Sequence, residues 1–116
     1  MTTTVTIATR SRTTIEDITP QVQQVVQRSG VGDGLCTVYV PHTTAGVIIN
    51  ENYDASVKRE ILATLNRLIP LEGDYQHSEG NSDAHVKASL VGASVTVPVS
   101  AGKLMLGVWQ GILFCE

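Results

Sequence analysis

The chain has 116 residues, of which 42% are hydrophobic and only 16% are charged, and its formal net charge is −3. This length predicts one domain spanning residues 1–116, because chains usually divide only when they are much longer. The eight lysine and arginine residues are scattered, which argues against nucleic-acid binding, since phosphate backbones are bound by clustered basic residues. The low charge also predicts a homo-oligomer, in which a partner chain covers part of the surface.

The beginning of the chain and its hydropathy predict a cytoplasmic protein that does not enter a membrane. Residues 1–12 lack the charged start and apolar stretch of a secretory signal. No apolar run approaches the roughly 20 residues that span a bilayer. Cys36 and Cys115 lie in apolar runs without metal-binding spacing, and we interpret both as buried, reduced thiols.

The first half of the chain predicts strands around one helix. Residues 3–9 alternate threonines with Val5 and Ile7, which is typical of a strand. A helix is predicted after them, with Thr19 as its N-cap, Pro20 at its first position and Gly30 as its stop.

Two further strands are predicted before the next helix. Residues 35–40 are apolar on both sides, which indicates a central strand, and residues 45–50 resume extended structure. The next helix, residues 54–69, ends before Pro70. Its inner face is predicted to consist of Val57, Ile61, Leu65 and Leu68.

The rest of the chain predicts a short helix and a terminal hairpin. The helix covers residues 83–91, with Ser82 as its N-cap and Gly92 as its stop. Residues 93–99 and 104–116 predict strands joined by a tight turn. Strands at both ends with two to three helices between them predict a single α+β domain with largely antiparallel sheets.

The segment "HSEGNSDAH", residues 77–85, concentrates reactive side chains at the start of the short helix. His85 and Asp83 would lie in its first turn, near the positive end of the helix dipole, and His77 and Asn81 in the preceding loop. This setting suits an anion or a metal–anion pair. The alternative is a solvated connector with a helix cap, which accounts for Ser82 and Asp83 but not for two histidines.

Two other segments carry candidate ligand-binding residues. His42, Thr43 and Thr44 follow a buried strand, and Glu51 ends the next one, so both could border one pocket if these strands pair. The alternative for His42 is a loop histidine that bonds only to backbone. Trp109 and Gln110 are predicted on opposite faces of a strand, although a lone tryptophan is more often part of a core.

The histidines suggest a divalent metal, Zn²⁺ or Mg²⁺, and no motif indicates an organic cofactor. We hypothesise that His42, His77 and His85 converge on one ion, with Glu51 as general acid/base or orienting carboxylate. Protonated, the same imidazoles would hold a phosphate. The spacing of His77 and His85 matches no standard zinc motif, so metal is permitted by the sequence rather than required.

The segments "HTTAGVIINE", "HSEGNSDAH" and "SVTVPVSAGKLMLGVWQGI" resemble, in this order, the YjbQ-like family, often called the secondary thiamine-phosphate synthase family. The resemblance implies an α+β fold, a compact trimer and a weak ability to join a pyrimidine pyrophosphate to a thiazole phosphate. The resemblance implies that the family's functional positions correspond to His42, Glu51, His77, Asn81, Asp83, His85, Trp109 and Gln110. The family pattern has threonine where this chain has Val108, and it continues past Glu116.

Two functions follow. The first is an enzyme acting on a small anionic or phosphorylated metabolite, with Glu51, His77, Asp83 and His85 as catalytic residues. No lysine or arginine lies in a candidate segment, so we expect slow pyrophosphate chemistry. The second is a non-catalytic trimer whose clefts bind a small ligand or metal.

Overall fold

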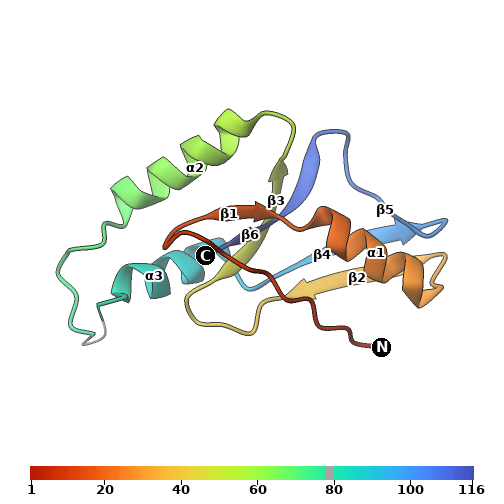
Figure 1. Cartoon of the computed structure of the whole chain (residues 1–116), viewed down its shortest axis with the longest axis horizontal. Helices are drawn as coiled ribbons and strands as arrows, with labels where there is room; N and C mark the ends of the chain where they lie inside the picture. The colour runs from red at the N-terminus through yellow and green to blue at the C-terminus, as the bar shows by residue number, and fades with distance from the viewer. Residues whose placement is uncertain (78–79) are drawn as a thin grey trace.

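The computed structural model describes residues 1–77 and 80–116 and shows an α+β domain with two antiparallel three-stranded sheets (Figure 1). The first sheet has the order β1-β6-β3, built from β1 (Ile15–Asp17), β6 (Gln110–Cys115) and β3 (Gly46–Glu51). The second has the order β2-β4-β5, built from β2 (Gly34–Tyr39), β4 (Ser94–Ser100) and β5 (Lys103–Leu104). The helices are α1 (Thr19–Ser29), α2 (Ala55–Leu68) and α3 (Ser82–Val91). The predicted fold class is therefore confirmed.

The core lies around β6, which is the central strand of its sheet. Ile112 and Leu113 on β6 are fully buried, and β1 and β3 pair with the two edges of this strand. α1 packs against β6 and the second sheet. The main cluster of buried side chains consists of Ile18, Val22, Val40, Ala45, Val47, Val97, Ile112 and Phe114.

α1 ends as the sequence predicts but begins one residue earlier. Its N-cap is Ile18, because Asp17 accepts a 2.9 Å hydrogen bond from the Thr19 backbone N–H, and the Thr19 hydroxyl accepts one from the N–H of Ile112 at 2.8 Å. At the other end Gly30 has a φ of 74°, the left-handed conformation that glycine adopts without strain.

Three strand predictions are wrong. Residues 3–9 form no strand, since β-branched alternation does not produce one without a neighbour for its N–H and C=O groups. The strand predicted to be central, residues 35–40, corresponds to β2, which lies at a sheet edge beside β4. The predicted strand 104–116 is divided, because residues 105–109 form a connection between the two sheets.

The predicted tight turn is confirmed. Ala101 and Gly102 connect β4 to β5 with φ angles of 51° and 76°. Two successive positive φ angles match the right-handed twist of a two-residue hairpin, and glycine adopts the second of them freely.

α2 starts at its predicted position but buries less than expected. Asp54 is its N-cap and accepts a 2.9 Å hydrogen bond from the Ser56 N–H. None of its residues is fully buried, and Leu68 is exposed. A cavity of about 170 Å³, here called the inner cavity, lies between α2, α3 and β1. Leu62 and Leu65 of α2 line it. Among the described residues, no helix combines the length and the apolar character that crossing a membrane requires.

Candidate functional site

The amino end of α3 carries two buried polar atoms that no other described residue contacts by a hydrogen bond. The N-cap is Asn81 rather than Ser82: the Asn81 carbonyl accepts from the N–H groups of Ala84 and His85 at 3.1 and 3.3 Å. Asn81 Oδ1 and Ser82 Oγ are buried and have no hydrogen-bond partner within the described part of the chain. Buried polar atoms are nearly always satisfied, so both are candidate ligand contacts.

Asp83, in the first turn of α3, is 3% exposed and lies between two cations. Arg12 Nη2 donates to its Oδ1 at 3.1 Å, and Lys87 Nζ lies 3.5 Å from its Oδ2. Arg12 also donates to the Gly80 carbonyl, and Lys87 donates to Asn66 on α2 at 2.6 Å. A buried carboxylate needs such partners, because an unpaired charge is costly to remove from water.

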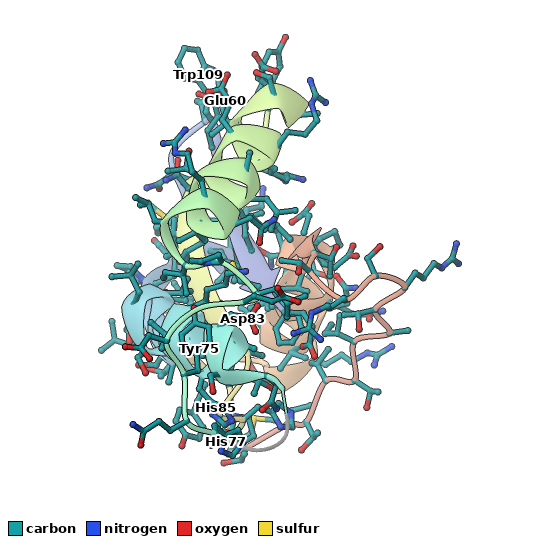
Figure 2. All side chains as sticks on the ribbon, turned by 90° about the vertical axis from the view of Figure 1, so that its left-hand side faces the viewer. Glu60, Tyr75, His77, Asp83, His85 and Trp109 are labelled. Carbon is teal, nitrogen blue, oxygen red and sulfur yellow. The ribbon has the colours of Figure 1, made fainter. Side chains whose placement is uncertain are left out.

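His77 and His85 meet at one end of the molecule. Their ring centroids are 5.0 Å apart and the rings are edge to face (Figure 2). They border an open hollow, here called the histidine hollow, lined by Asp74, Tyr75, Gln76, His77, Ser82, His85 and Val86. Tyr75 is held there by a 2.6 Å hydrogen bond from its hydroxyl to the Pro70 carbonyl. Ser78 and Glu79 of the same segment lie outside the described residues.

The histidine hollow offers two of the three imidazoles expected for a metal. Two imidazoles that bind one tetrahedral Zn²⁺ at about 2.0–2.1 Å have ring centres roughly 5 Å apart, which His77 and His85 match. His42 does not line this hollow. Across residues 1–77 and 80–116, no three His, Cys, Asp or Glu side chains gather in a group that could hold an ion.

Of the candidate residues His42, Thr43 and Thr44, one lies near α3. Thr44 lines the inner cavity together with Asn81 and Asp83, whereas His42 and Thr43 are exposed in the loop between β2 and β3. The sequence allows His42 and Glu51 to border one pocket if β2 and β3 pair. They do not pair, because β2 and β3 belong to different sheets, and Glu51 lies at the end of β3 that is far from His42.

Glu51, Trp109 and Gln110 lie together, but away from the histidines. Glu51 is paired in register with Gln110, and the Trp109 carbonyl accepts a 2.7 Å hydrogen bond from Asn52. Trp109 lies in a turn before β6 rather than on a strand. Figure 2 shows Trp109 and the histidines at opposite ends of the molecule, so one chain does not bring the two groups together.

Sequence reasoning missed Arg12 and Lys87. The premise that no lysine or arginine reaches the candidate residues is wrong, because both contact Asp83. The contact between Lys87 and Asp83 could have been predicted from the sequence, because residues four apart on a helix lie on the same face. Arg12 lies 71 residues from Asp83, and only the fold places it there.

The comparisons with known proteins agree on one family. The family model described as "UPF0047 protein YjbQ-like" matches residues 3–116. A UPF0047 protein of Methanocaldococcus jannaschii is 52% identical over 95% of this chain and 80% of its own length. The UPF0047 protein YugU of Bacillus subtilis is 47% identical over 95% of this chain and 84% of its own.

Solved structures show the same relationship. An uncharacterised conserved protein of the YjbQ/UPF0047 family from Clostridium acetobutylicum has a TM-score of 0.93 and 51% identity, covering 95% of this chain and 85% of its own. A YjbQ-like protein from Sulfolobus solfataricus has a TM-score of 0.90 and 33% identity, covering 95% and 80%. The chain therefore belongs to the YjbQ-like UPF0047 family.

Proposed function

We propose that this protein binds a small phosphorylated metabolite at the amino end of α3 and acts on it as a slow enzyme. The observation that carries the proposal is the set of groups around the first turn of α3. Arg12 and Lys87 contact Asp83 at the inner cavity, and the paired imidazoles of His77 and His85 border the histidine hollow. A helix amino terminus adds N–H groups without intrahelical partners and a favourable dipole.

The residues suit a reaction in which a phosphorylated group departs. Thiamine-phosphate synthesis, the activity that the sequence resemblance implies, breaks a carbon–oxygen bond to pyrophosphate while a ring nitrogen attacks the carbon. Charge stabilisation on the leaving group then matters more than a protein nucleophile. Ser82 Oγ, which has no partner among the described residues, would donate to the phosphate, and protonated His77 or His85 would neutralise it.

A divalent metal fits this site through the two imidazoles. His77 and His85 would hold it, and imidazole pairs favour Zn²⁺ over Mg²⁺, which prefers oxygen ligands. When bound, such an ion supplies Lewis-acid stabilisation to a phosphate oxygen. A third protein ligand, for which His42 remains our hypothesis, would then come from another subunit.

We further propose that a trimer completes the site. Trp109 and the histidines lie on opposite sides of the molecule (Figure 2), and Glu51 and Gln110 are close to Trp109 on the paired strands β3 and β6. A small metabolite can contact both groups only if they belong to different subunits. A symmetric ring of chains brings unlike surfaces together in this way.

Calorimetric titration with inorganic pyrophosphate tests the anion site. Arg12→Ala and Lys87→Ala should each weaken binding about tenfold or more, because hydrogen bonds to charged groups contribute about 1.5–3 kcal/mol. Arg10→Ala, which removes an exposed arginine two residues from Arg12, is the matched control and should bind like the wild type. Equal affinities for all four proteins would refute the anion site.

A turnover assay separates the enzyme from the alternative, a non-catalytic trimer that binds a small ligand or metal. The pyrimidine pyrophosphate and thiazole phosphate are incubated with protein and Zn²⁺ or Mg²⁺, and thiamine phosphate is quantified. Because Arg12 and Lys87 are both paired with Asp83, we still expect product to form far more slowly than the median enzyme rate of about 10 per second. Product should be lost in His77→Ala and His85→Ala. Saturable binding without product would support the alternative.

A further inference from the structure

Two aromatic rings stack on each other at the end of the molecule opposite to α3. Tyr53 precedes α2 and Trp109 precedes β6; their ring centroids are 6.4 Å apart and their planes differ by 29°. Tyr53 is 81% exposed and Trp109 60% exposed. Aromatic side chains bury large areas when they serve a core, so this pair contributes little to folding.

The backbone beneath the rings is fixed although the rings are exposed. The N–H of Asn52 donates to the Trp109 carbonyl at 2.7 Å, which joins the two segments. Gln110 closes the turn before β6, because its Oε1 accepts from the Gly107 N–H at 2.8 Å and its own N–H donates to the Gly107 carbonyl at 3.0 Å.

Asn52 and the start of β6 are tightly packed against each other. A Cβ at Gly111 would lie 2.7 Å from Asn52 Cβ, closer than such atoms approach. The backbone that carries Tyr53 and Trp109 is therefore rigid. Binding a planar ligand to these rings would cost the protein little conformational entropy.

The charges around the rings favour a cation. Residues 50–54 and 105–111, which carry the two rings, contain the carboxylates Glu51 and Asp54 and no basic residue. Figure 2 shows Glu60 at the same end of the molecule. Lys58 and Arg59 follow on α2 and oppose this charge in part. Aromatic faces are themselves negative and attract cations.

We propose that Tyr53 and Trp109 form a binding site for a planar heteroaromatic cation, such as an N-alkylated pyridinium ring. The ring stacks on the pair, and the carboxylates of Glu51 and Asp54 balance its charge. This inference names a ligand class for the group of Glu51, Trp109 and Gln110 that the proposed function assigns to the trimeric site. Its test uses no residue of α3, so it can fail while the anion site at α3 stands, and the reverse.

Nuclear magnetic resonance tests the site directly, because Trp109 is the single tryptophan and gives one indole N–H signal. N-methylpyridinium should shift this signal saturably. Pyridine at pH 8, a neutral planar ring, should bind more weakly, and the planar anion benzoate weakest of all. Tyr53→Ala should weaken N-methylpyridinium binding about two- to fivefold, the effect of one exposed cation–π contact.

Val31→Ala is the control, since it truncates an exposed apolar side chain in the loop after α1 and should leave the affinity unchanged. Tyr53→Phe keeps the ring and should also bind as the wild type does. A shift that never saturates, or equal affinity in wild type and Tyr53→Ala, would overturn the proposal. So would an indole shift caused by protein concentration alone, which would assign the pair to a contact between copies of this chain.

Discussion

Asp83, Arg12 and Lys87 form a charged cluster at the candidate site. The side chain of Lys87 is 13% exposed and that of Arg12 is 54% exposed, so the Lys87 pair is less screened by water. Through Asn66 and Gly80 the same network reaches α2 and the loop before α3. Asp83 therefore has a structural role besides any role in binding, and experiments on it must include a measurement of folding.

Cys115 gives a pH-dependent test of the core. Burial raises the pKa of its thiol to about 11 from an ordinary value of 9.0. The folded state keeps the proton that the unfolded chain releases, so this contribution to stability is fully present below pH 9 and is lost between about pH 9 and 11. At most about 3 kcal/mol is involved, since each pKa unit corresponds to about 1.4 kcal/mol.

Urea unfolding at a series of pH values measures this loss. In Cys115→Ala the decrease in unfolding free energy from pH 9 to 11 should be smaller than in the wild type. Cys36 is only half-buried, although burial also raises its pKa, so Cys36→Ala should change the slope less. The same decrease in wild type and Cys115→Ala would contradict the prediction.

The junction of β3 and α3 shows how closely two elements pack near the site. Val47 donates its N–H to the Gly92 carbonyl at 3.1 Å, and a Cβ at Gly46 would lie 2.5 Å from that oxygen and 2.8 Å from a methyl carbon of Val91. Only glycine at position 46 permits this approach. The end of α3 is therefore fixed on the first sheet, and its amino end is positioned from there.

Gly46→Ala should lower the unfolding free energy by about 1–3 kcal/mol, the usual cost of inserting a methyl group where no space exists. Chemical denaturation measures the effect. Gly32→Ala is the matched control, because a Cβ there meets nothing within 4 Å and its φ is not positive. If both variants lost the same stability, the close contact at Gly46 would not be the cause.

On the scale of the whole molecule, apolar side chains on the surface support an oligomer. Leu35 and Tyr39 are exposed on β2, an edge strand, and Val86 and Leu90 are exposed on α3. Edge strands and contiguous apolar patches are where other chains bind. The trimer that the family resemblance implies predicts a mass of about three times 12.4 kDa in light scattering at micromolar concentration.

Leu35→Glu should shift that mass toward the monomer, because it places a charge on the exposed edge strand. Circular dichroism would verify that the fold of the variant is intact. A stable monomer in the wild type would refute both the trimer and the proposal that two subunits complete the site.

Local interactions made the helices predictable. Asp54, Pro70, Gly30 and Gly92 mark helix ends through contacts with residues a few positions away, and the sequence displays such residues directly. The hairpin at Ala101 and Gly102 was predictable for the same reason. The segment of His77 and His85 was also recognisable, since its residues are neighbours in the chain.

Long-range contacts decided the rest. A strand needs a partner, so the sequence could not reveal that β3 pairs with β6 or that residues 3–9 join neither of the described sheets. The fold alone brings Arg12 to Asp83 across 71 residues and Tyr53 to Trp109 across the first sheet. The sequence determined which side chains could do chemistry; tertiary structure decided which of them meet, because burial and strand pairing depend on residues far apart in the chain.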